Sequence, residues 1–95
     1  MEVRADTWLW AIRMYKSRTL ASEAIKGGKV KLNGQNFKAS HIIKIGETFT
    51  LSIGSNKKIV EVLALIDKRG SFELALKHYI DHSPKPDKNE ILPSA

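Results

Sequence analysis

The sequence predicts a single α+β domain, in which two short helices are followed by a small antiparallel sheet and one last helix. Three observations predict this arrangement. The chain has 95 residues, which is the length of one small domain. Apolar residues recur at helical spacing in the first part of the chain and alternate with polar residues from Lys29 onward. Helical spacing then returns after Ser71.

The two predicted N-terminal helices meet at a short corner. Asp6 is expected to cap the first helix, because its carboxylate can accept from free backbone N–H groups, and Tyr15-Lys16 to end it. Ser17 is expected to cap a second helix over about residues 18–26, which Gly27-Gly28 ends because glycine adopts left-handed backbone angles freely. The apolar stripes of the two helices are Ala5, Trp8, Leu9 and Ile12, and Leu20, Ala21, Ala24 and Ile25.

The strand patterns begin directly after the second helix. Residues 29–32 alternate lysine with apolar residues, which predicts a strand with both lysines on one side. Asn33-Gly34 is typical of a two-residue hairpin turn, so we expect residues 35–38 to form the returning strand. Two further strands are expected at residues 48–53 and 58–66.

A last helix is predicted after Ser71, whose hydroxyl can cap it. Its apolar stripe is Phe72, Ala75, Leu76, Tyr79 and Ile80. Pro84 and Pro86 are expected to end it, and residues 83–95 to form a flexible tail. The domain is therefore expected to cover residues 1–82.

Charge gives the clearest functional signal. Sixteen Lys and Arg residues against ten Asp and Glu residues give a net charge of +6 and a pI near 9.7. Residues 1–40 carry eight basic and three acidic side chains, so nearly all of the excess belongs to them. Such clustering predicts a basic face and a polyanionic partner, either a nucleic acid or an anionic membrane surface.

Several classes of function are disfavoured. The absence of cysteine excludes disulfides and thiolate chemistry. The chain has neither a phosphate-binding P-loop nor a serine in a Gly-x-Ser-x-Gly setting, and its carboxylates are scattered. His78 and His82 have a spacing that can hold a metal, but histidines near the end of a helix more often interact with its dipole. We therefore expect no enzyme, no metal and no cofactor.

Location and assembly follow the same reasoning. No apolar run approaches the roughly 20 residues that span a bilayer, and residues 1–6 lack the layout of a signal peptide. We expect a cytoplasmic monomer that binds neither a membrane nor a small-molecule substrate.

The candidate binding residues lie at the ends of elements and along one strand. Arginine and lysine side chains there can bind a phosphodiester backbone, and free N–H groups near Arg18 can add to them. The candidate contacts are Arg4, Arg13, Lys16, Ser17, Arg18, Lys26, Lys29, Lys31, Asn33 and Lys38.

Three stretches of the sequence, at residues 4–13, 16–21 and 24–34, together resemble the S4 RNA-binding domain. The resemblance covers roughly residues 4–51. The Trp-Leu-Trp-Ala stretch and Lys68-Arg69 are similar to one branch, the small bacterial heat-shock S4 proteins that bind large ribosomal subunits. Two features depart from the family: Ala39 stands where proline is common, and residues 83–95 are short and near neutral where that branch has a long basic extension.

The resemblance implies an S4-type fold (the αL motif), with two helices packed on a small sheet, and structured RNA, above all ribosomal RNA, as the partner. It implies recognition by phosphate position and shape, because the deep groove of A-form RNA hides the base edges. Large-subunit binding under stress is the more specific role that it implies.

Two other readings stay open on the residues alone. The two short helices with a basic corner also resemble a helix-turn-helix DNA-binding unit. However, the outer face of the second helix carries few side chains that could contact bases. The two tryptophans, Trp8 and Trp10, also suit a protein-docking module, but we expect at least one of them to belong to the core.

Overall fold

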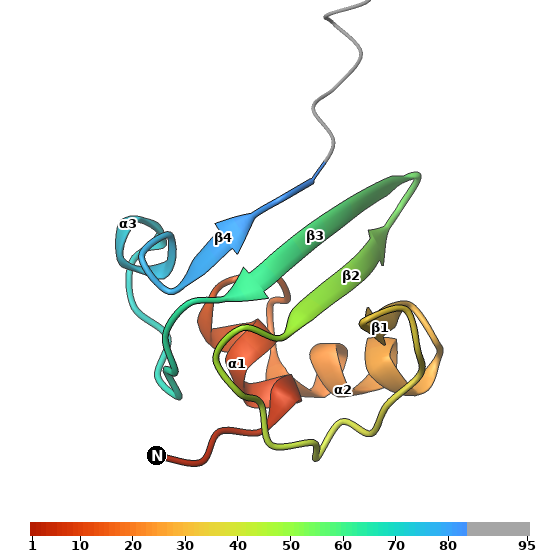
Figure 1. Ribbon diagram of the computed structural model, residues 1–95, viewed down its shortest axis with the longest axis horizontal. Coiled ribbons are helices and arrows are strands. Elements are labelled where there is room, and N and C mark those ends of the chain that lie inside the picture. The colour runs from red at the N-terminus through yellow and green to blue at the C-terminus, as the bar shows by residue number, and fades with distance from the viewer. Residues whose placement is uncertain (84–95) are drawn as a thin grey trace, which may run out of the picture.

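The computed structural model describes residues 1–83, in which three helices cover and flank a four-stranded sheet. Figure 1 shows α1 (Ala5–Ala11) and α2 (Arg18–Lys26) beneath the sheet and α3 (Phe72–Ala75) at one end of it. The strands are β1 (Val30–Leu32), β2 (Thr48–Ile53), β3 (Asn56–Val62) and β4 (Tyr79–Asp81). The predicted α+β class is confirmed. The tail expected at residues 83–95 lies, apart from Ser83, outside the described residues.

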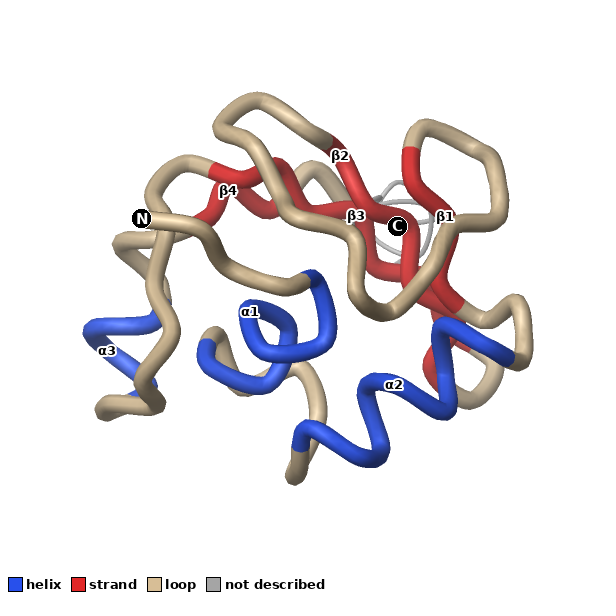
Figure 2. The backbone as a smooth tube through the Cα atoms, turned by 90° about the horizontal axis from the view of Figure 1, so that it is seen from below, coloured by secondary structure: helices blue, strands red, loops and turns tan. Residues whose placement is uncertain are grey.

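The sheet is fully antiparallel, in the order β1-β2-β3-β4. Leu32 of β1 lies opposite Phe49 of β2, and Phe49 lies opposite Val60 of β3. Because side chains alternate along a strand, this register places Phe49, Leu51, Val60 and Val62 on one face, and all four are fully buried. Figure 2 shows the strands in one layer and α1 and α2 in the other.

Trp8 joins the two layers. Its side chain is fully buried, and its ring centroid lies 6.0 Å from that of Phe49. Its indole Nε1 donates to the backbone carbonyl of Ala64, 3.0 Å away, so the polar end of the ring is also satisfied. Trp10 is only half-buried. The expectation that at least one tryptophan belongs to the core is confirmed.

The predicted limits of the first helix are wrong at both ends. Arg4 is the N-cap, and the Asp6 carboxylate accepts from the Arg4 guanidinium instead of capping the backbone. The helix ends at Ala11, and Arg13 has a left-handed φ of 70°. A residue with that backbone conformation cannot continue a right-handed helix, so the chain turns there toward α2.

The predicted limits and cap of the second helix are confirmed. It covers Arg18–Lys26, and the Ser17 hydroxyl accepts from the backbone N–H of Leu20. Gly27 is its C-cap, and Gly28 has a φ of 77°, which glycine adopts without strain. Ala21, Ala24 and Ile25 of the predicted stripe are buried, but Leu20 is exposed, so its place in the buried stripe is a wrong prediction.

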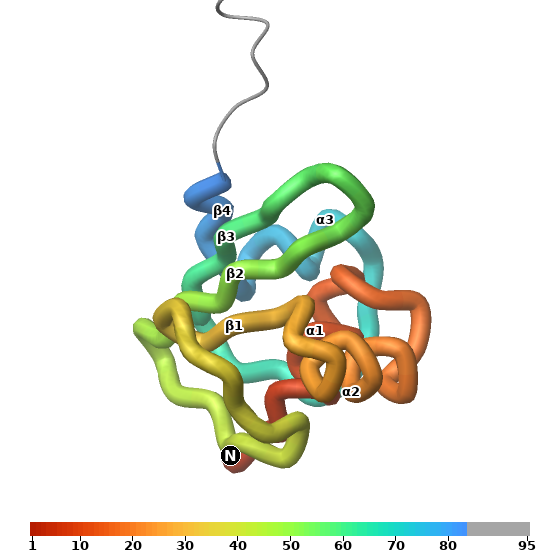
Figure 3. The backbone as a smooth tube through the Cα atoms, turned by 90° about the vertical axis from the view of Figure 1, so that its right-hand side faces the viewer, coloured from red at the N-terminus to blue at the C-terminus, as the bar shows by residue number. Residues whose placement is uncertain are grey.

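The turn at Asn33-Gly34 is confirmed, but the returning strand is not. Both residues have positive φ, and Leu32 and Gln35 exchange two backbone hydrogen bonds across the turn. The chain then leaves the sheet, because Phe37 packs inward with its ring centroid 5.3 Å from that of Phe49. Figure 3 shows residues 33–47 running along one side of the domain and past the N-terminus before β2 begins.

The last predicted helix is mostly wrong. Ser71 does cap a helix, through a hydrogen bond from the Leu74 N–H, but α3 ends at Ala75. Tyr79 and Ile80 belong instead to β4, which pairs with β3. Strand pairing satisfies the backbone of β3 along its outer edge, and it overrides the helical spacing of the apolar residues. β3 ends at Val62, whereas the strand predicted there continued to Ile66.

Candidate nucleic-acid interface

A groove of about 450 Å³ lies between the start of α1 and the exposed face of α2. We call it the basic groove. It is lined by Arg4, Asp6, Thr7, Arg18, Thr19, Ser22, Glu23 and Lys26. A neighbouring depression of about 400 Å³ shares Arg4, Ser22 and Lys26 and continues to Lys38 and Ser40. Four predicted contacts, Arg4, Arg18, Lys26 and Lys38, therefore line two adjoining hollows on one side of the molecule.

The periodicity of α2 creates one wall of this groove. Residues 18, 19, 22, 23 and 26 share one side of a helix, because positions three and four apart are neighbours on its surface. The opposite side of α2 carries Ala21 and Ile25, which are buried in the core. Burial of that apolar side therefore turns Arg18 and Lys26 toward the groove.

Arg4 forms the other wall and is held by a carboxylate. Its Nε donates to Asp6 Oδ1 at 3.1 Å, and its Nη2 donates to Asp6 Oδ2 at 2.9 Å. The Asp6 side chain is 9% exposed, whereas that of Arg4 is 54% exposed. The hydrogen bonds to Asp6 and its negative charge raise the pKa of Arg4 above the usual arginine value. Arg4 therefore presents a permanent, oriented positive charge.

Arg18 is positioned by an aromatic ring. Its guanidinium carbon lies 5.4 Å from the ring centroid of Trp10, within the range of a cation–π interaction. Trp10 comes from α1 and Arg18 from the first turn of α2, so packing of the two helices sets where this cation lies.

Arg13 lies elsewhere and has a structural partner. Its Nη1 donates to the carbonyl of Gly70, 2.7 Å away. In the opposite direction, Arg69 donates from Nε to the carbonyl of Trp10 and from Nη2 to that of Tyr15, each at 3.3 Å. We call this reciprocal set the arginine latch. It ties the corner between α1 and α2 to the segment before α3, and Arg13 does not line the basic groove.

The remaining predicted contacts are spread around α2 and β1. Lys16 is exposed at the corner between the helices, and the Ser17 hydroxyl serves as the cap of α2. Lys29 lines a separate depression with Tyr15 and Leu20. The Lys31 Nζ donates to Asn36 Oδ1.

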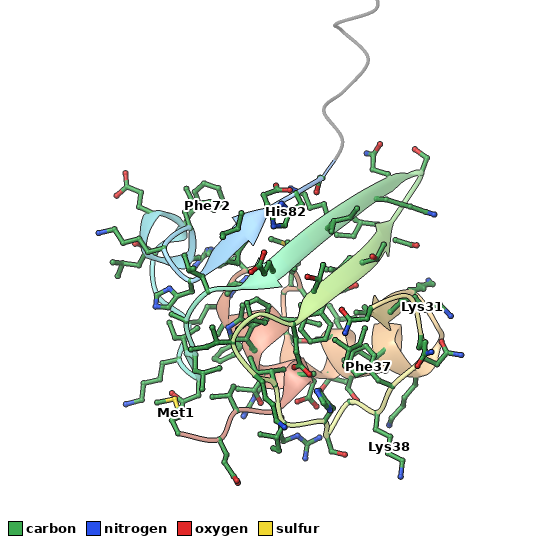
Figure 4. All side chains as sticks on the ribbon, viewed as in Figure 1. Met1, Lys31, Phe37, Lys38, Phe72 and His82 are labelled. Atoms are coloured by element: carbon green, nitrogen blue, oxygen red, sulfur yellow. The ribbon has the colours of Figure 1, made fainter. Side chains whose placement is uncertain are left out.

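Figure 4 shows Lys31 and Lys38 at the end of the molecule that carries α2 and β1, with Phe72 at the opposite end. Asn33, at the tip of the turn after β1, is exposed. Its role in binding stays a prediction, as does that of each of the other candidates except Arg13, for which the contact with Gly70 favours a role in the fold instead.

The histidines have partners within the protein. His78 lies just before β4, where its Nδ1 donates to the Leu74 carbonyl, 2.8 Å away, at the end of α3. His82 lies beyond β4, with its Nε2 2.8 Å from Glu61 Oε1. The two histidines do not share a helix as the spacing suggested, and residues 1–83 contain no cluster of three or more His, Asp or Glu side chains that suits a metal ion.

The predicted contacts omit several residues of the groove and all of the hydrogen bonds of the latch. The predicted role of Asp6 as a cap is wrong, and its position two residues after Arg4 is the signal for a local pair. Thr19, Ser22 and Glu23 follow directly from the helical period once the buried side of α2 is known. Lys68-Arg69 stands out in the sequence only as a feature of the heat-shock branch. Nothing there signals the contacts of Arg69, because its acceptors are backbone carbonyls more than fifty residues away.

Comparison with known proteins relates this geometry to a family. Residues 3–49, which include α1, α2 and most of the groove, match the model of the S4 domain. The chain is 42% identical to heat shock protein 15 of Escherichia coli over 90 residues, which cover 95% of this chain and 68% of that relative. The chain belongs to the heat shock protein 15 family. The resemblance to S4 domains inferred from the motifs is thereby confirmed.

The heat shock protein 15 family also accounts for the whole fold. The trimeric structure of heat shock protein 15 from Vibrio cholerae superposes with a TM-score of 0.86 at 37% identity, over 99% of this chain and 95% of that one. A second relative is the Bacillus subtilis protein named RQC P-site tRNA stabilizing factor, which is 36% identical over 73 residues, covering 77% of this chain and 85% of that protein.

Proposed function

We propose that this protein binds structured RNA of the ribosome in the basic groove, without catalysing a reaction. The observation that carries the proposal is the convergence of Arg4, Arg18 and Lys26 from two helices onto one groove, with Lys38 on the adjoining hollow. Guanidinium and ammonium groups so arranged suit successive phosphates of a folded strand.

The names of the relatives support the choice of RNA. The Bacillus subtilis relative is named for stabilising a transfer RNA in the ribosomal P site. The Escherichia coli relative is named a heat shock protein. The finer part of the proposal, which follows the resemblance to the heat-shock branch of S4 proteins, is that ribosomal RNA of the large subunit is the target. We also propose that heat stress is an occasion for binding and that binding takes place in the cytoplasm.

A binding titration with a charge-matched control tests the groove. Arg18→Ala/Lys26→Ala removes two groove charges, whereas Lys57→Ala/Lys77→Ala removes two exposed charges outside it. We expect the first variant to bind ribosomal RNA at least about 150-fold more weakly, because hydrogen bonds to charged groups contribute about 1.5–3 kcal/mol each and two are lost. The second variant should change little. Equal losses in the two variants would show that net charge and not the groove carries binding.

Competitors then identify the nucleic acid. Unlabelled ribosomal RNA, transfer RNA and duplex DNA are added to the preformed complex, and the anisotropy of the labelled RNA is followed. Strong competition by duplex DNA would favour the helix-turn-helix reading. Co-sedimentation with purified large and small subunits, before and after heat shock, tests the finer proposal, which fails if the two subunits bind equally.

The monomeric state is a prediction that sedimentation velocity checks directly. The Vibrio cholerae relative is trimeric in its solved structure.

Within residues 1–83, no helix is long and apolar enough to cross a membrane.

A further inference from the structure

We propose that Asp6 is a positioning residue of the basic groove: its carboxylate fixes the guanidinium of Arg4 in the orientation that binds an RNA phosphate. This inference rests on the proposed function, because it assigns to Asp6 a role in RNA binding at the same site. It concerns an acidic residue, which a search for RNA contacts by charge alone would reject.

The geometry of the pair supports this role. A guanidinium has five N–H donors in one plane, and Asp6 takes only two of them, one on Nε and one on Nη2. The two donors of Nη1 and one of Nη2 remain on a side chain that is half exposed and lines both adjoining hollows. A planar group held along one edge therefore offers its opposite edge to a phosphate.

Asp6 is itself held in place by the scaffold. Its backbone N–H donates to the Ala39 carbonyl at 3.3 Å, and the next hydroxyl along the chain, Thr7 Oγ1, lies 3.4 Å from Asp6 Oδ1. The neighbouring N–H of Ala5 donates to the His41 carbonyl at 2.8 Å. The carboxylate is thus buried where α1 meets residues 39–41, so Arg4 is ordered before RNA arrives. Without Asp6, the side chain of Arg4 would become ordered only when RNA binds. The conformational entropy lost at that step would weaken binding.

Glu23 provides an internal comparison. It lines the same groove, it is exposed, and it has no ion-pair partner within residues 1–83. A carboxylate near phosphates repels them, so a role through charge alone gives Asp6 and Glu23 the same effect on RNA affinity. A positioning role gives them opposite effects.

The experiment compares Asp6→Asn with Glu23→Gln, since both substitutions remove one negative charge and keep the shape of the side chain. We expect Glu23→Gln to bind ribosomal RNA about twofold more tightly, because a repulsion is removed. We expect Asp6→Asn to bind roughly fivefold to tenfold more weakly, because Arg4 loses its two-point contact. The salt dependence of Asp6→Asn should also become shallower, by roughly 0.7–0.9 in log–log slope, as one phosphate contact is lost.

Two further variants separate positioning from a loss of folding. Asp6→Glu keeps the charge but displaces the guanidinium, so it should also weaken binding. In an Arg4→Ala background, Asp6→Asn should no longer weaken binding and should strengthen it slightly, because only the repulsion remains to be removed. Thermal unfolding of each variant fixes a temperature at which all are folded.

The outcomes distinguish the inference from the function beneath it. If Asp6→Asn strengthens binding as Glu23→Gln does, the positioning role is wrong while RNA binding in the groove stands. If Asp6→Asn weakens binding equally with and without Arg4, the effect does not pass through Arg4, and the inference is again wrong. If the unchanged protein fails to bind ribosomal RNA at all, the proposed function itself is wrong.

Discussion

The two ends of α1 each carry an arginine, and the structure uses the two in different ways. At the start of the helix, Arg4 donates two hydrogen bonds to a neighbouring carboxylate, and its other N–H donors remain available at the surface of the basic groove. At the other end, Arg13 donates to the backbone carbonyl of Gly70 in the arginine latch. Arg4 thus contributes to the surface of the groove, whereas Arg13 stabilises the fold. The acceptor that each guanidinium reaches, and not its charge, therefore sets its role.

Salt provides the largest expected contrast between groove and latch. If the four cations of the two hollows, Arg4, Arg18, Lys26 and Lys38, neutralise one phosphate each, log affinity should fall with log salt at a slope of about −3. Raising salt from 50 to 200 mM should then weaken RNA binding by about 50- to 150-fold. Filter binding over this range measures the slope.

The slope also shows which residues the contact includes. A slope near −5 would mean that cations outside the two hollows, such as Lys16, Lys29 and Lys31, also contact RNA. A slope of −1 or weaker would contradict binding in the groove. Unfolding by urea at the same salt concentrations serves as the control, because the latch joins its arginines to uncharged carbonyls and should respond little.

Arg18 and Arg13 give the sharpest single-residue test. Arg18→Ala should weaken RNA binding by about 1–3 kcal/mol, roughly 5- to 150-fold, because a charged hydrogen bond to phosphate is lost. Arg13→Ala has the same change in charge, but it should leave affinity nearly unchanged and lower the free energy of unfolding by about 1 kcal/mol. The contrast collapses if the two variants lose equal affinity in an anisotropy titration.

Arg69 tests the latch from its other side. Arg69→Met keeps the length of the side chain but removes both hydrogen bonds, leaving the carbonyls of Trp10 and Tyr15 without this donor. We expect a loss of about 1–2 kcal/mol in the free energy of unfolding, or a fall of roughly 4–16 °C in Tm. Calorimetry measures Tm. RNA affinity measured well below the new Tm should match that of the unchanged protein, and a tenfold loss would place the latch within the binding site.

Tyr15→Phe has the smallest expected effect on stability, and it should be a gain where Arg69→Met gives a loss. Its hydroxyl is buried and has no hydrogen-bond partner within residues 1–83, so Tyr15→Phe should raise stability by up to about 1 kcal/mol. Urea denaturation at neutral pH measures this change. A clear loss of stability would mean that the hydroxyl does form a hydrogen bond in the folded protein.

The pH dependence gives a second measurement on Tyr15. Burial raises the pKa of Tyr15 above that of a free phenol. The folded state therefore holds the proton more tightly than the unfolded chain. The stability linked to it is full below about pH 10 and is lost as pH rises through the folded pKa. Because phenylalanine cannot titrate, Tyr15→Phe should flatten this alkaline loss, and an unchanged profile would assign the loss to other groups.

Much of the fold followed from local chemistry. The serine cap at Ser17, the two glycines after α2 and the Asn33-Gly34 turn are each set by backbone angles that few residue types adopt. These signals need no distant partner, so the sequence was sufficient for them. The concentration of positive charge in residues 1–40 likewise predicted the half of the chain that carries the basic groove.

Other features depended on contacts between distant residues. Residues 35–38 continue a good hairpin, yet Phe37 is drawn toward Phe49 and the pairing ends. Tyr79 and Ile80 complete a helical stripe, yet the open edge of β3 takes them as a strand. In both places, burial of a ring or pairing of a strand edge outweighs a weak local preference.

Three features could be read from local sequence: which residues carry the charge, where α2 begins and ends, and that Ala21, Ala24 and Ile25 lie on its buried side. Only the tertiary structure decided which cations share a groove, since that depends on how α1 packs against α2 and against residues 39–41. Packing also buries the Asp6 carboxylate beside Arg4 and brings Arg13 and Arg69 to backbone carbonyls more than fifty residues away. Burial and hydrogen bonds to distant carbonyls depend on position in space, which spacing along the chain does not encode.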